Sequence, residues 1–341
     1  MKKYLILAIV FVMMIPSVYA AEKIVEMSRL KRPATIIVDG GQILIAEFPT
    51  VYVYSQEDYS FLTSFGKEGD GPREFSQYIR IQKDPENPDK IVVGSHMKMS
   101  YFTREGKFIS EKRPRTAGLA VVYKPFGEQF VSYGNYQDSE TKTNYQTVVL
   151  YDKDMKKIKE VYKEKNVFQQ GRKINALRTW GAWFRLYDDR IFITGEKEGY
   201  VLLYDRDGNF KREIKCDLRS LKVRDGDKAR YHEFFRTDPQ TKNFYDAFKQ
   251  QIDFPSDFPV IRGMDVVDDK LYVNGYPGPD GRTEFAIYDL DGKLIKNKIY
   301  LPLPEATARD LYPYTIKDNK LYQLVDNDDE EVWELHIHDL N

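Results

Sequence analysis

One pattern of alternating apolar and polar positions recurs along the chain. Each copy has a short strand-like segment, a few polar residues and a second such segment, followed by a tight turn. In the copy that begins RIFITG, Ile191 and Ile193 fall on one face of a strand and Phe192 on the other, which is the period-two alternation typical of β-strands. The six copies begin at Gln42, Lys90, Gln129, Arg190, Lys270 and Lys320.

The segments between the copies complete the repeat. A further alternating segment precedes each copy, at residues 35–40, 78–84, 119–124, 182–189, 263–269 and 314–318. Gly106, Gly208 and Gly292 each follow an acidic residue between two predicted strands, where glycine supplies the positive φ of a hairpin turn. Four strands in about 50 residues match one blade of a β-propeller. The pattern therefore predicts an all-β fold, a six-bladed β-propeller with four-stranded antiparallel blades.

The last copy lacks a strand. It ends at HIHDL, after three predicted strands, although a closed propeller needs a fourth. The segment 22–30 precedes the first blade and can supply that strand. We expect this N-terminal strand to close the last blade, because ring closure removes exposed sheet edges.

Two stretches resemble known propellers. SFGKEGDGPREF, from Ser64 to Phe75, is similar to the blade junction of six-bladed propellers of the NHL-repeat type. DFPVIRGMDVVDDKLYV, from Asp257 to Val273, resembles exported bacterial six-bladed propeller proteins. The resemblance implies the fold. It does not select a function, because propellers include enzymes, binding proteins and scaffolds.

The first 20 residues have the pattern of a signal peptide. Lys2 and Lys3 precede an apolar run over 4–15, which is too short to span a bilayer, and Pro16 follows it. We expect cleavage after Ala20 and no lipid anchor, because no Cys lies near that site. The mature chain, 21–341, is predicted to be a single domain without a membrane segment, located in the periplasm or secreted.

One blade contains an insertion, at about 219–260. Its part TKNFYDAFKQQI has apolar residues near helical spacing at Phe244, Tyr245, Phe248 and Ile252, which predicts a helix that covers the blade edges.

Composition narrows the range of partners. Aromatic residues make up 14% of the chain, which favours strands. The formal net charge is -1, so nothing suggests the basic field that nucleic-acid binding needs. Cys216 is the only cysteine, so no intramolecular disulfide can form. We expect a monomer.

Motifs for catalysis are absent from the sequence. It contains no GxSxG, HExxH, P-loop or GxGxxG motif, so we assign no catalytic residue and no metal ligand. The DRDG and DLDG pieces at 205–208 and 289–292 fit hairpin turns better than calcium loops. His336 and His338 share a strand face without a third ligand fixed beside them. An axial calcium remains an alternative, with candidate acids at Asp39, Asp84, Asp265 and Asp318.

Arginines recur near the start of each predicted inner strand, and aromatic residues accompany them. Inner strands begin around one mouth of the axial channel, so we expect these side chains to form an anion-binding mouth. The predicted ligand-binding residues are Arg32, Arg80, Arg115, Arg178, Trp180, Arg262, Arg309 and Tyr312.

The favoured function is non-catalytic binding of a protein, peptide, envelope glycan or other anionic ligand at one face. Two alternatives stay open. One is a propeller hydrolase or lyase with a metal in the axial channel, and the other is a subunit of a cell-envelope complex.

Overall fold

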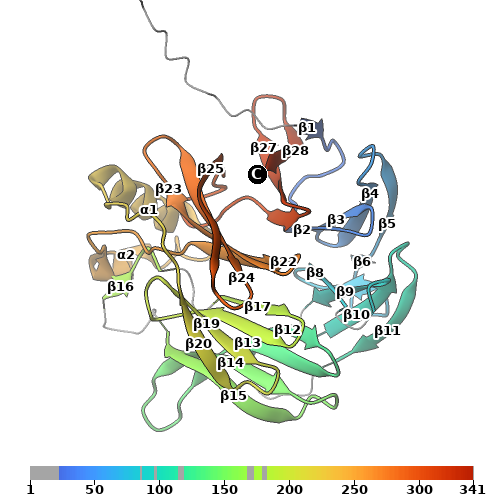
Figure 1. The fold of residues 1–341 in the computed structure, drawn as a ribbon, viewed down its shortest axis with the longest axis horizontal. Helices are drawn as coiled ribbons and strands as arrows, with labels where there is room; N and C mark the ends of the chain where they lie inside the picture. The colour runs from blue at the N-terminus through green and yellow to red at the C-terminus, as the bar shows by residue number, and fades with distance from the viewer. Residues whose placement is uncertain are drawn as a thin grey trace, which may run out of the picture.

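Six four-stranded antiparallel sheets follow one another around a ring in the structure, a computed structural model that describes residues 23–84, 87–95, 98–113, 119–166, 173–178 and 183–340 (Figure 1). The predicted six-bladed β-propeller is confirmed. The strands of the first three blades are β2 (Thr35–Asp39), β3 (Gln42–Glu47), β4 (Thr50–Ser55) and β5 (Phe61–Phe65); β8 (Arg80–Lys83), β9 (Lys90–Ser95), β10 (Lys98–Thr103) and β11 (Phe108–Lys112); and β12 (Leu119–Phe126), β13 (Gln129–Gln137), β14 (Asn144–Tyr151) and β15 (Lys157–Lys165).

The other three blades have the same arrangement. Their strands are β17 (Trp183–Tyr187), β18 (Arg190–Thr194), β19 (Tyr200–Asp205) and β20 (Phe210–Lys215); β22 (Gly263–Val267), β23 (Lys270–Pro277), β24 (Arg282–Asp289) and β25 (Leu294–Pro302); and β26 (Tyr314–Lys317), β27 (Lys320–Asn327), β28 (Val332–Asp339) and β1 (Lys23–Glu26).

The innermost strand of each blade overlaps a segment predicted from the alternation. These strands are β2, β8, β12, β17, β22 and β26, each at one end of its sheet. Strand β2 contacts both β8 and β26, and β22 contacts both β17 and β26, so the inner strands stand side by side around the axis.

The N-terminal strand closes the ring as predicted. Strand β1 pairs antiparallel with β28, with Lys23 opposite Ile337 and Glu26 opposite Glu334. The chain then turns inward, and Met27 and Leu30 are buried in the apolar cluster between the last and first blades. In Figure 1 the dark blue β1 lies beside the red β27 and β28.

Apolar side chains fill each junction between adjacent blades. Strand alternation sends one set of residues toward the preceding blade and the other toward the following blade. The result is six inter-blade clusters, one at each junction, which include Ile43, Val93, Phe130, Ile193, Val273 and Leu321. Cys216 belongs to one of these clusters, and burial raises the pKa of its thiol to about 12.

The junction motif after the first blade forms a tight loop. Strands β6 (Lys67–Glu68) and β7 (Glu74–Phe75) pair in parallel. Gly69 has φ +143°, and a Cβ there would lie 2.2 Å from Oε2 of Glu74. The loop therefore requires glycine at position 69.

The insertion folds differently from the prediction. Its main helix is α1 (Asp225–Thr237), whereas the segment with predicted helical spacing forms only the short α2 (Tyr245–Phe248), the 3-10 turn η1 (Lys249–Gln251) and β21 (Ile252–Asp253). Strand β21 pairs in parallel with β16 (Ile174–Asn175), which ends the helical spacing at Ile252. Figure 1 shows α1 and α2 together on one side of the ring.

The aromatic residues of the insertion form a core of their own. Tyr231 and Phe235 of α1 are buried against Leu177 and Ala308, which lie in loops before two different blades. The insertion thus links these loops.

The predicted signal peptide, residues 1–20, lies outside the described residues. Within the part of the chain that the structure covers, no helix is long and apolar enough to cross a membrane.

Candidate anion site in the axial channel

The six inner strands surround an axial cavity. Their alternation turns every second side chain toward the axis, so Arg80, Lys124, Arg185 and Asp265 line the cavity while their neighbours enter the inter-blade clusters. The cavity volume is about 1150 Å³. Ligand pockets commonly measure about 300–1,000 Å³, so the channel has room for a small molecule.

Four charged side chains in this cavity form what we call the channel cluster. They are Arg80 on β8, Lys124 on β12, Arg185 on β17 and Asp265 on β22. Nε of Arg185 donates a hydrogen bond of 2.8 Å to Oδ1 of Asp265. Within the described residues, neither Arg80 nor Lys124 forms an ion pair. The cluster therefore holds three cations and one carboxylate.

Lys124 shows the electrostatic consequence. Its ammonium lies 4.7 Å from the centre of the Phe184 ring. Burial, followed by repulsion from Arg185 and Arg80, lowers the pKa of Lys124 to about 7, although the Asp265 carboxylate acts in the opposite direction. A bound anion would offset this excess positive charge.

Neutral polar groups extend the site beside Asp265. Nδ2 of Asn274 donates a 3.3 Å hydrogen bond to the hydroxyl of Tyr314. A Cβ at position 263 would lie 2.6 Å from Oδ1 of Asn274 and 2.9 Å from the Tyr314 oxygen, so Gly263 makes room for both groups. Burial, and secondarily the Asp265 charge, raises the pKa of the Tyr314 hydroxyl, which stays protonated at neutral pH.

At the opposite end of the channel, several carboxylates pair with cations. Asp39 at the end of β2 accepts from Lys83 at 2.6 Å and also from Arg104, and these cations lower its pKa against the effect of burial. Lys317 pairs with Asp268 and lies 3.1 Å from Asp318. Each of these carboxylates already has a cation.

The acids proposed for an axial calcium do not lie together as a ligand set. Asp39, Asp265 and Asp318 each pair with a different cation. In 23–340, outside the gaps named above, no three His, Cys, Asp or Glu side chains are placed to hold a metal ion. At the predicted turns, Asp205 and Asp289 accept backbone N–H groups of their own loops.

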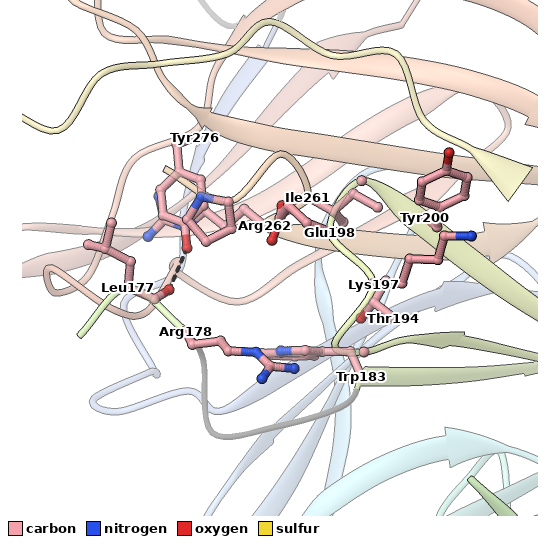
Figure 2. Close-up of a pocket in the computed structure, with 13 residues that line it drawn as sticks. Leu177, Arg178, Trp183, Thr194, Lys197, Glu198, Tyr200, Ile261, Arg262 and Tyr276 are labelled. Atoms are coloured by element: carbon pink, nitrogen blue, oxygen red, sulfur yellow. Dashed lines mark hydrogen bonds between the residues drawn. The ribbon is translucent and has the colours of Figure 1, made fainter. Parts of the chain in front are cut away.

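A second, smaller recess opens beside the channel and is shown in Figure 2. We call it the side pocket. Its volume is about 50 Å³, and Trp183 lines both this pocket and the channel. Figure 2 shows Arg178 extending toward Trp183, with Lys197 and Tyr200 on the far side. Tyr276 closes one end, where its hydroxyl donates a 3.0 Å hydrogen bond to the carbonyl of Leu177.

The cations around the side pocket have acidic partners. Arg178 lies 2.9 Å from Oε2 of Glu164, which also accepts from the Tyr162 hydroxyl at 2.8 Å. Arg262 pairs with Glu305 and stacks on Tyr276 at 4.9 Å, and its side chain is only 2% exposed.

The structure separates the predicted arginine mouth into several environments. Arg80 lines the channel, whereas Arg178 and Arg262 line the side pocket. Arg309 is buried under α1, 5.7 Å from the Phe234 ring and 5.6 Å from the Phe235 ring. These four arginines therefore do not form one open ring at the axis, because Arg178, Arg262 and Arg309 have acidic or aromatic partners elsewhere.

The other predicted residues lie elsewhere. Arg32 is exposed and its backbone N–H donates to Glu47 at 3.0 Å. Tyr312 packs edge-on against Trp333, with ring centres 5.6 Å apart. Arg115 and Trp180 lie outside the described residues. A ligand-binding role for these residues remains a prediction.

Sequence reasoning missed Lys124, Arg185 and Trp183 as residues that line the axial cavity. The signal was available, because all three occupy alternate positions of inner strands that were correctly predicted. Counting polar residues on the channel face of each inner strand would have found them.

Comparisons with known proteins support the fold alone. No protein-family model and no curated protein matches the chain. Among solved structures, it is similar to one named "Putative exported protein (BF0058)" from Bacteroides fragilis NCTC 9343, with a TM-score of 0.55, 12% identity, and coverage of 91% of this chain and 90% of that chain.

Two further structures are similar at lower scores. One is the Cps50 (Swd1) β-propeller domain of Myceliophteria thermophila, with a TM-score of 0.41, 13% identity and coverage of 89% and 84%. The other is a protein of unknown function from Bacteroides caccae, with a TM-score of 0.39, 8% identity and coverage of 83% and 82%.

Proposed function

We propose that this protein is an exported, non-catalytic binding propeller that holds a small anionic ligand in its axial channel. The observation that supports this function is the channel cluster, where Arg80, Lys124 and Arg185 share a single carboxylate, Asp265, inside an axial cavity of about 1150 Å³. Export to the periplasm or the medium is part of the proposal. Residues 1–20 and the name of the Bacteroides fragilis neighbour support it.

Charge complementarity gives the physical reason. Like charges that share a partly buried site are unfavourable unless an opposite charge joins them. A carboxylate, phosphate or sulfate beside Arg80 and Lys124 would form charge-assisted hydrogen bonds and offset the repulsion that, together with the larger effect of burial, lowers the pKa of Lys124. Binding of an anion thus accounts for the cluster without a reaction step.

Calorimetric titration with galacturonate tests the proposal, with galactose as its neutral match. We expect galacturonate to bind at least about tenfold more tightly than galactose, a difference of about 1.4 kcal/mol. Arg80→Gln and Lys124→Met should each remove this preference, and added NaCl should weaken it.

Lys83→Gln is the matched control. Lys83 belongs to the same cavity but has its own partner, Asp39. The variant should bind galacturonate as the parent does. Equal affinity for the two sugars, or unchanged galacturonate binding by both Arg80→Gln and Lys124→Met, would overturn the proposed function.

A further inference from the structure

Trp183 connects the channel cluster to the side pocket. It is the first residue of β17, its side chain is 43% exposed, and it lines both cavities. Arg185 follows on the same face of the strand, about 7 Å away at the usual rise per residue. Trp183 therefore lies next to Arg185 along the channel face of β17.

The side pocket differs from the channel cluster in its charge balance. Its cations Arg178 and Lys197 are paired with Glu164 and Glu213. The pocket therefore does not need an anion.

Donors and acceptors nevertheless line this pocket beside aromatic faces. The side chains of Arg178 and Lys197 can donate, Glu198 can accept, and Thr194 can do both.

Among the aromatic side chains, Tyr200 carries Lys197 at 4.2 Å and Tyr276 carries Arg262 at 4.9 Å, whereas Trp183 is 43% exposed. An exposed aromatic face beside polar groups of both kinds suits a ring that has apolar faces and hydroxyl groups on its edge. The volume of about 50 Å³ admits one substituent of such a ring, and the exposed Trp183 provides the surface on which the ring itself can lie.

We propose that the ligand is an acidic oligosaccharide: one sugar places its acidic group among Arg80, Lys124 and Arg185, and the adjacent sugar stacks on Trp183 with a substituent in the side pocket. This inference rests on the proposed function and names its ligand class. Uronates and sulfated sugars both carry the required acidic group. The affinities of the corresponding monosaccharides can distinguish between them.

Calorimetry with digalacturonate, galacturonate and cellobiose tests the second subsite. Digalacturonate should bind at least about tenfold more tightly than galacturonate, which corresponds to about 1.4 kcal/mol, within the range of one aromatic contact. Cellobiose, which lacks an acidic group, should bind at least about tenfold more weakly than digalacturonate. Comparing the affinities of galactose 6-sulfate and galacturonate shows which acidic group the channel prefers.

Trp183→Ala isolates the stacking contact. It should abolish the preference for digalacturonate over galacturonate, because the second sugar loses its stacking surface while the channel cluster remains intact. Trp183→Phe keeps an aromatic face and should retain most of the preference. Phe210→Ala is the control, since Phe210 is a 54% exposed aromatic residue on β20, the outer strand of the same blade.

The outcomes separate this inference from the proposed function. If galacturonate binds through Arg80 and Lys124 but digalacturonate binds no more tightly, or if Trp183→Ala keeps the preference, the second subsite is wrong and anion binding stands. If adenosine monophosphate bound more tightly than digalacturonate, the group that stacks on Trp183 would be an aromatic base and not a sugar, and the inference would be wrong. If no acidic sugar binds, both proposals fail.

Discussion

The channel cluster and the side pocket use the same types of residue in opposite ways. Around the side pocket, Arg178 and Arg262 each face a carboxylate, and Arg262 is also stacked on Tyr276. In the channel cluster, only Arg185 has such a partner. An arginine close to a cavity is therefore a candidate for ligand binding only where no carboxylate compensates its charge.

This comparison assigns the two regions different energetic roles. Removing one partner of a buried ion pair leaves an uncompensated charge and costs about 3–5 kcal/mol. Removing a cation from a group of like charges relieves repulsion instead. Side-pocket variants should therefore lower stability, and channel-cluster variants should lower binding.

The largest expected effect is at Glu305. This side chain pairs with Arg262 of the side pocket and also with Arg230 of α1, so it connects the insertion to the ring. Glu305→Gln should lower the free energy of unfolding by about 3 kcal/mol, measured by urea denaturation, because Arg262 is buried and loses its counter-charge. Arg230→Gln is the control and should cost much less, since the Arg230 side chain is 45% exposed. Equal losses of unfolding free energy in the two variants would show that the buried charge of Arg262 does not determine the cost.

A smaller loss is expected at Glu164. Its carboxylate is buried, accepts from Tyr162 and pairs with Arg178, whose side chain remains partly exposed. Glu164→Gln should therefore lower the free energy of unfolding by about 2 kcal/mol, the range of a hydrogen bond to a charged group. The loss can be measured by thermal unfolding. An unchanged midpoint temperature would contradict a stabilising role for the Glu164–Arg178 pair.

Lys124 of the channel cluster should make the folding stability depend on pH. The pKa of Lys124 is about 7 in the folded protein, below the value of about 10.4 for lysine in an unfolded chain. Above pH 7 the unfolded chain therefore binds more protons at this residue, and folding stability rises with pH. Between pH 7 and pH 8 the parent should gain about 1 kcal/mol relative to Lys124→Met. Parallel pH profiles for the two proteins would show that Lys124 carries an ordinary charge.

The smallest effect is expected at the Asp39 end of the channel. Lys83 pairs with Asp39, and its side chain is 44% exposed. Lys83→Gln should change the free energy of unfolding by less than about 1 kcal/mol, as is usual for exposed pairs. A larger loss of stability in urea denaturation would show that the Lys83–Asp39 pair contributes more than an ordinary exposed ion pair.

The fold was largely predictable because its signals are local. Period-two alternation located all six inner strands, and the missing last strand identified 22–30 as the closing segment, where β1 lies. The insertion was less predictable. Its 245–252 segment has helical spacing, but pairing of Ile252 with Ile174 in β16 ends that helix early, and this contact joins residues far apart in sequence.

The site was less predictable because it depends on pairing across the ring. Arg178 and Arg80 look equivalent in sequence, since each lies near the start of an inner strand. They differ because Glu164, on the outer strand of the previous blade, reaches Arg178. Sequence alternation can show which side chains face the channel, but only the folded ring shows which cations have acidic partners.

The most direct test of the account is a crystal structure of the mature protein grown with galacturonate. The account predicts the sugar in the axial channel, with its carboxylate oxygens at about 2.7–2.9 Å from nitrogen atoms of Arg80 and Lys124, the distances of charge-assisted hydrogen bonds. A sugar bound only at the outer strands or beside α1, with the channel cluster occupied by solvent alone, would contradict it.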